Sequence, residues 1–160
     1  MTDTNPLLQD LELPPFEQFE PNQIEPAMTQ LIKEGKAKIE EVLASPAPAT
    51  WTSVIEPIDQ QSRRMDNAWA VFSHLNNVKD SAELREAYGK ALAMITEYST
   101  WVGQHEGLFK AYKQIEESNE YNELSTAQKE TIRQALLGFR LSGIDYPQQK
   151  KNSTLSYKTN

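Results

Sequence analysis

The sequence predicts an all-α protein: an antiparallel bundle of four to five long amphipathic helices, preceded by an extended, acidic, proline-rich arm. Apolar residues recur at intervals of three and four along most of the 160-residue chain. Alternation with a period of two is absent, and no Asn-Gly or Asp-Gly hairpin turn occurs. Residues that favour helix starts precede several of the apolar stripes. These three observations together favour helices over strands.

The opening segment of the chain differs in composition from the rest. The first thirty residues hold six acidic residues and no lysine or arginine, against a net charge of -7 for the whole chain. They also hold five of the nine prolines, which disfavour helix at and before their positions. Residues 1–21 are therefore predicted to form an extended arm. Its large apolar side chains give it surface to pack against the protein: Leu7, Leu8, Leu11, Leu13, Phe16 and Phe19.

The first helix is predicted to begin at Asn22 and to end before residues 45–49, which read Ser-Pro-Ala-Pro-Ala. Asn22 is a good N-cap, and Glu25 follows at the spacing of a capping box. Pro26 is tolerated because it falls within the first turn. The apolar stripe consists of Ile24, Met28, Leu31, Ile32, Ile39, Val42 and Leu43.

A second helix is predicted to begin near Thr50 or Thr52, with Pro57 tolerated only because it lies close to the start. The pair Asn76-Asn77 weakens its far end. Its stripe consists of Trp51, Val54, Ile55, Ile58, Met65, Trp69, Phe72 and Leu75.

A third helix is predicted from the capping box Asp80-Ser-Ala-Glu83, and its stripe extends past Gly103 and Gly107, where a kink is one option. The stripe consists of Leu84, Ala87, Tyr88, Ala91, Leu92, Ile95, Tyr98, Trp101, Val102, Leu108, Phe109, Tyr112 and Ile115. The last helix is predicted from the box Ser125-Thr-Ala-Gln128, and Gly143 is placed to close it. Its stripe consists of Ile132, Ala135, Leu136, Phe139 and Arg140.

Composition excludes several classes of protein. The absence of cysteine excludes disulfides, iron–sulfur clusters and cysteine-bound zinc, and two histidines cannot make a three-histidine metal site. The negative charge argues against nucleic acid as a partner. No apolar run approaches the ~20 residues that span a bilayer, and the amino terminus lacks the features of a secretory signal. A cytoplasmic protein without nucleic-acid or membrane partners is expected.

One short segment invites comparison with a zinc-binding helix. His105-Glu106 begins like the motif His-Glu-x-x-His, in which both histidines reach the metal from one helix face. Phe109 stands where the second histidine is required, and it has no ligand atom. His105 is therefore predicted to be a packed or hydrogen-bonded histidine.

The other residues that could carry a catalytic or binding role are also better explained as structural or surface residues. His74 is predicted to have a structural or helix-end role, with contact to a ligand as the alternative. The adjacent pairs Glu40-Glu41 and Glu116-Glu117 point about 100° apart on a helix, which is typical of solvated surface. No catalytic, cofactor-binding or metal-ligating residue is therefore predicted in this chain.

A series of short segments nevertheless follows an order that is typical of a known family. They read Asn5-Pro-Leu-Leu, Leu13-Pro-Pro-Phe-Glu-Gln-Phe, Ile24-Glu-Pro-Ala, Trp69-Ala-Val-Phe-Ser-His-Leu-Asn, Glu83-Leu-Arg-Glu-Ala-Tyr, Tyr98-Ser-Thr-Trp-Val-Gly-Gln-His-Glu-Gly-Leu-Phe-Lys-Ala-Tyr112 and Phe139-Arg-Leu-Ser-Gly-Ile. Over residues 5–151 the chain resembles the amino-terminal segment of oligopeptidase A-like zinc metallopeptidases, in the thimet oligopeptidase family.

The resemblance implies a helical scaffold that helps wall the channel admitting short peptides. The family's catalytic zinc is held by a His-Glu-x-x-His helix and a further glutamate, far downstream of the region matched here. No residue of this chain corresponds to those ligands, so the chain is expected to be inactive alone. The implied partners are the missing catalytic domain and, in the parent enzyme, zinc and short peptides.

The last residues depart from the family, which would continue into another long amphipathic helix. Residues 152–160 are polar and lack helical periodicity. They suggest a shortened product, from a shifted reading frame or an engineered cut. The expected organisation is an arm over 1–21, a helical domain over 22–151 and a polar tail over 152–160. The alternative function is a free-standing helical module that binds a partner protein through exposed apolar faces.

Overall fold

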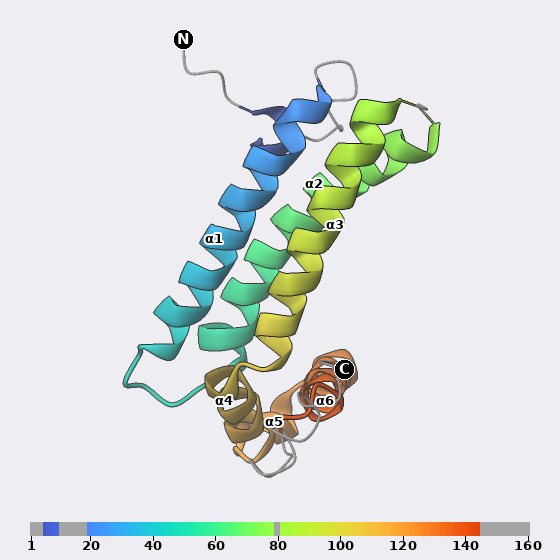
Figure 1. Ribbon diagram of the computed structural model, residues 1–160. Coiled ribbons are helices and arrows are strands. Elements are labelled where there is room, and N and C mark those ends of the chain that lie inside the picture. Colours follow the sequence, from blue (N-terminus) through green and yellow to red (C-terminus); the bar gives the residue numbers. More distant parts are fainter. Residues whose placement is uncertain (1–4, 10–18, 79–80, 145–160) are drawn as a thin grey trace. The chain divides into compact units, whose positions relative to one another are not determined.

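The computed structural model describes residues 5–9, 19–78 and 81–144 (Figure 1). Every regular element in these ranges is helical, which confirms the predicted all-α class. The α-helices are α1 (Ile24–Leu43), α2 (Glu56–Val78), α3 (Ala82–Gly103), α4 (Glu106–Glu116), α5 (Glu120–Glu123) and α6 (Thr126–Leu141). Three shorter turns are η1 (Pro6–Leu8), η2 (Pro21–Gln23) and the π-helical η3 (Trp51–Ile55).

The chain divides into two compact units. The first lies within Met1–Ser45 and Thr52–Tyr98, and the second within Pro46–Trp51 and Ser99–Asn160. Helix α3 contributes to both, because the division falls after Tyr98. The periodic stripes gave no sign of this division, since each helix has an apolar face whichever unit it belongs to.

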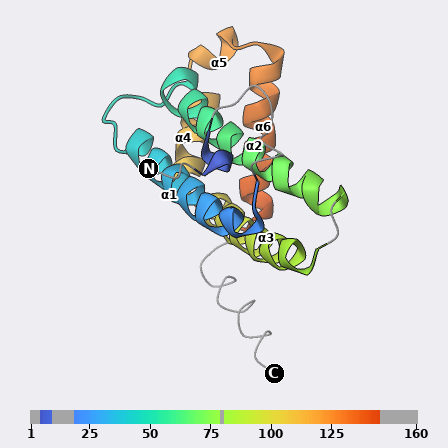
Figure 2. The same ribbon diagram turned by 90° about the horizontal axis from the view of Figure 1, so that it is seen from above.

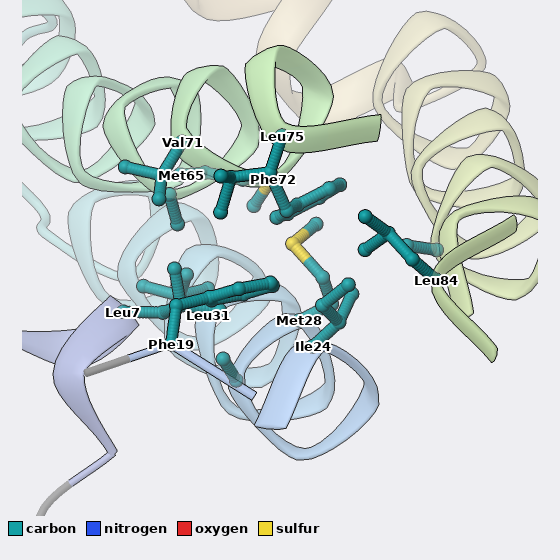
Figure 3. Packing of buried hydrophobic residues seen from close by; sticks show 13 residues of the cluster. Leu7, Phe19, Ile24, Met28, Leu31, Met65, Val71, Phe72, Leu75 and Leu84 are labelled. Carbon is teal, nitrogen blue, oxygen red and sulfur yellow. The ribbon is translucent and has the colours of Figure 1, made fainter. Parts of the chain in front are cut away.

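In the first unit, α1 and α2 lie side by side and run in opposite directions (Figures 1 and 2). The expected stripes supply the core that joins them, and Phe72 of α2 points toward Met28 of α1 (Figure 3). Aromatic rings extend this core to α3, because Tyr88 lies 5.3 Å from Trp69 and 6.2 Å from Phe72 between ring centroids. The buried members are Leu7, Phe19, Ile24, Ala27, Met28, Leu31, Met65, Ala68, Val71, Phe72, Leu75, Leu84 and Ala91.

The described ends of the arm pack as expected. Leu7 and Phe19 are buried in the core of the first unit, and Leu8 packs against it. Asn5 fixes the η1 turn, because its Oδ1 accepts the Leu7 N–H at 3.0 Å while its Nδ2 donates to the carbonyl of Gln23 at 2.7 Å. The other predicted contacts of the arm, at Leu11, Leu13 and Phe16, lie outside the described residues.

The predicted N-cap of the first helix is displaced by two residues, because the helical turn begins after Glu20 and not after Asn22. The turn η2 precedes α1, and the Glu20 N–H donates to Oε1 of Gln23 at 2.8 Å, so Asn22 is not the N-cap. Pro21 accounts for the difference, because its fixed φ favours the first position of a helical turn. The cap predicted at Asp80 lies outside the described residues. In α3 it is Ser81 that caps, with its Oγ accepting the Leu84 N–H at 3.1 Å.

The second predicted helix begins where expected but not as an α-helix. The chain coils from Trp51 in a π-helical turn, and the α-helical part starts at Glu56. Pro57 explains the change of geometry. In a continuous α-helix its ring would press on the carbonyl of Ser53, to which it has no N–H to donate. A wider turn before Pro57 removes that conflict.

The predicted extension of the third helix past Gly103 is also wrong. Helix α3 ends at Gly103, and α4 is a separate helix that begins at Glu106. A Cβ atom on Gly103 would lie 2.6 Å from Oγ of Ser142, so the glycine permits a close approach between two parts of the second unit. Leu92, placed in the predicted apolar stripe, is 45% exposed.

In the second unit, α4 packs against α6. The buried side chains come from both helices: Leu108, Ala111, Ile115, Ile132, Leu136 and Phe139. The predicted capping box of α6 is confirmed, because Ser125 Oγ accepts the Gln128 N–H at 3.3 Å and Gln128 Oε1 accepts the Ser125 N–H at 2.9 Å. Gly143 closes the helix as predicted, with a φ of 86° that glycine tolerates.

Candidate functional site

The His105-Glu106 segment forms a helix start. The Leu108 N–H donates to Nδ1 of His105 at 3.2 Å, so the imidazole caps α4. Its ring meets the edge of Trp101 with centroids 4.9 Å apart. Phe109, at the position of the missing histidine, packs against Phe139 at 5.9 Å. The prediction that His105 is packed and hydrogen-bonded is therefore confirmed.

The described residues offer no group of three or more histidine, aspartate or glutamate side chains that could hold a metal ion. His105 has one ring nitrogen committed to the backbone, and His74 lies exposed on α2. The residues present within the described ranges do not fit a zinc site, which needs three or four converging ligands.

A groove of about 1060 Å³ lies in the first unit, between α1 and α3. Small or rigid side chains line part of it, among them Pro26, Ala37 and Ala87, while charged and uncharged polar side chains line the remainder. Lys90 of α3 connects the two walls, because its Nζ lies 3.0 Å from Glu86 on its own helix and 4.0 Å from Glu25 on α1. This groove could not be predicted, since the periodicity of apolar residues indicates buried faces and not the spacing between helices.

The lining of this groove combines acidic and basic side chains with a single hydroxyl, that of Thr29. No histidine belongs to its lining, so the commonest general base is missing beside Thr29, the one hydroxyl there. The ion pairs of Lys90 involve exposed groups, and such pairs contribute little to stability. The groove therefore offers a surface of mixed charge.

Glu34 of α1 accepts hydrogen bonds from three side chains. Its Oε1 accepts a hydrogen bond from Gln30 at 2.9 Å, and its Oε2 accepts from Arg64 at 2.6 Å and from Gln61 at 3.3 Å. The hydrogen bond from Gln30, helped by those from Gln61 and Arg64, lowers the pKa of Glu34 below 4.5 against the opposing effect of burial. This carboxylate ties α1 to α2.

Glu34 gives the fold a defined pH dependence. Its pKa is lower in the folded than in the unfolded chain, so it stabilises the fold above pH 4.5, and that stabilisation is lost as the pH falls through the folded pKa. Glu34→Gln should therefore flatten the loss of stability below pH 4.5, measured by urea unfolding at a series of pH values. Glu41→Gln, which removes an exposed carboxylate of the same helix, is the matched control. Equal slopes for Glu34→Gln and the parent chain would contradict the assignment.

A few large apolar side chains face solvent. They are Val78, Leu92, Leu137 and Leu141, with exposed fractions of 62%, 45%, 41% and 79%. Leu137 and Leu141 are four residues apart in α6 and so lie on one face of that helix. Among the described residues, no helix combines the length and apolar character needed to cross a membrane.

Comparison with known proteins defines the class to which this fold belongs. The family model described as "Neurolysin/Thimet oligopeptidase, N-terminal domain" matches residues 28–151. The chain therefore belongs to the neurolysin/thimet oligopeptidase family, through the amino-terminal domain of that family. This finding confirms the resemblance inferred from the ordered segments.

The individual relatives to which the chain is similar include oligopeptidase A sequences from bacteria and a plant. Oligopeptidase A of Escherichia coli (strain K12) is 45% identical over 148 residues, which are 92% of this chain and 22% of the relative. Oligopeptidase A of Haemophilus influenzae is 46% identical over 151 residues, or 94% of this chain and 22% of the relative. A probable cytosolic oligopeptidase A of Arabidopsis thaliana is 29% identical over 148 residues, 92% of this chain and 21% of the relative. The chain thus spans about a fifth of the length of these curated relatives.

Proposed function

We propose that this chain serves as the amino-terminal helical domain of a zinc-dependent oligopeptidase that hydrolyses short peptides. The observation that carries the proposal is the extent of the match. More than nine-tenths of the chain aligns with oligopeptidase A sequences, yet these residues make up only 22% of each bacterial relative. Its role there is that of a scaffold that helps wall the peptide channel.

The chain itself supplies no catalytic residue in this proposal. His105 uses Nδ1 to cap α4, and Phe109 occupies the position where a second zinc ligand would stand. The zinc of the parent enzyme, whose chemistry is to activate a bound water for attack on the peptide bond, belongs to the remainder of the polypeptide. The partners of the chain are then that catalytic remainder and, in the whole enzyme, short peptides. A cytoplasmic location agrees with the name of the probable cytosolic oligopeptidase A of Arabidopsis thaliana.

A peptidase assay tests the catalytic part of the proposal. The purified chain is incubated with internally quenched fluorescent peptides, with added zinc and with a chelator, beside Escherichia coli oligopeptidase A as the positive control. The expected rate for the chain equals that of the blank, because no described group can hold zinc. Hydrolysis by the chain that zinc supports and the chelator abolishes would contradict the proposal.

A further inference from the structure

The outward face of α6 carries apolar side chains that the described residues of the second unit leave exposed. We call Leu137, Gly138 and Leu141 the α6 outer patch. At 100° per residue, Leu141 lies on the side of the helix opposite the buried Ile132, and Leu137 lies on the same side as Leu141. Their exposed fractions of 79% and 41% are unusual for leucine in a helix that already buries a separate apolar stripe.

Gly138 is a second, independent observation on this patch. A Cβ atom added there would meet no other atom within 4 Å, so an alanine would fit without strain. Glycine in a helix interior is less favourable than alanine, and no close contact among the described residues of the second unit compensates for it. A helix or loop packed on this face would explain the glycine, because the absence of a side chain at position 138 lets another backbone approach α6 closely.

The apolar character is confined to one end of the helix. The preceding turns of the same face carry Glu130, which pairs with Arg133 at 2.6 Å and accepts a hydrogen bond from Gln134 at 2.7 Å. These groups are exposed and fully paired with one another, as expected of a solvated surface. The first turns of this face of α6 are charged and its last turns are apolar, so burial is favoured at the α6 outer patch.

We propose that the α6 outer patch packs against the part of the oligopeptidase polypeptide that lies beyond this chain. The inference rests on the proposed function. The matched relatives have more than three-quarters of their length outside the aligned region, and the family match runs across α6 to residue 151. The remainder of the polypeptide is therefore large enough to supply a covering segment for α6.

The size of the patch favours a connected partner over a second copy of the chain. A stable interface between separate chains buries roughly 800 Å² on each partner, far more than two leucines and a glycine provide. A segment joined covalently to the domain binds at a high effective concentration, so a small apolar contact suffices.

The test uses a full-length chimera, in which this chain replaces the aligned segment of Escherichia coli oligopeptidase A. Leu137→Lys/Leu141→Lys should lower the melting temperature of the chimera by several degrees and speed its cleavage by a protease at least several-fold. In the chain alone the same pair should lower the melting temperature much less, because Leu141 is already 79% and Leu137 41% exposed there. The control Ala127→Lys/Thr131→Lys, with the same charge and spacing on exposed positions of α6, should change neither protein.

Gly138→Ala should change the melting temperatures of the two proteins in opposite directions. It should raise the melting temperature of the chain alone and lower that of the chimera, because the added methyl group fits only while the face is uncovered. Equal effects in the two proteins, or a chimera insensitive to the lysine pair, would overturn the proposal. So would a dimer of the isolated chain that the lysine pair dissociates.

Peptide hydrolysis by the unsubstituted chimera separates this proposal from the proposed function. A folded but inactive chimera counts against the function, whatever α6 does. An active chimera whose stability ignores the lysine pair counts against the outer patch alone.

Discussion

Replacing Phe72 by alanine should destabilise the first unit by about 3–5 kcal/mol, the range for removing a large aromatic side chain from a packed core. Phe72 is 0% exposed and meets the rings of Trp69 and Tyr88 with centroids 4.9 Å and 6.2 Å away. The substitution would leave a cavity where side chains from three helices converge (Figure 3). Such a loss is a large part of the 5–15 kcal/mol that stabilises an ordinary domain.

Urea unfolding followed by circular dichroism measures this effect. Leu92→Ala is the control, since that leucine is 45% exposed and its truncation should cost less than about 1 kcal/mol. Equal losses for Phe72→Ala and Leu92→Ala would mean that the core of the first unit is not organised around Phe72.

Gly35→Ala should destabilise the first unit by about 1–3 kcal/mol, although alanine is the better helix former. A Cβ atom on Gly35 would lie 2.6 Å from the hydroxyl oxygen and 3.2 Å from Cζ of Tyr98 on α3. Burial raises the pKa of Tyr98, in agreement with a phenol turned toward the protein. The glycine thus allows the tyrosine ring to lie against α1.

Two variants isolate this contact. Gly89→Ala makes the same change in the middle of α3, where nothing lies within 4 Å, and it should stabilise the chain by about 0.5–1 kcal/mol. In a Tyr98→Phe background the nearest clashing atom is gone, so Gly35→Ala should cost less than in the parent chain. A Gly35→Ala variant as stable as Gly89→Ala would show that the close approach does not constrain the fold.

The features that could be predicted from the sequence are those fixed by nearby residues. The caps at Ser125 and Gly143 were predicted correctly because each depends on residues within a few positions of the chain. The start of α1 is also set by nearby residues, but two local signals compete there. Pro21 favours a helical turn that begins earlier than the capping preference of Asn22 indicates. At the break between α3 and α4, His105 caps the second helix and Ser142 approaches Gly103 closely, and the periodicity of apolar residues signals neither feature.

The same distinction applies to the site. The structural role of His105 followed from one local fact, the phenylalanine at position 109 in place of a histidine. The groove between α1 and α3 and the exposed end of α6 could not be predicted, because both depend on which helix faces remain uncovered after packing. The family was recognisable because many short segments keep their order over most of the chain.

The role of this chain as an amino-terminal scaffold is tested most directly by the rate at which three proteins hydrolyse quenched peptides with zinc present. They are this chain alone, Escherichia coli oligopeptidase A lacking its aligned segment, and the chimera in which this chain replaces that segment. An amino-terminal scaffold predicts chelator-sensitive hydrolysis by the chimera only. Hydrolysis by the chain alone, or full activity of the relative without the segment, would contradict the account.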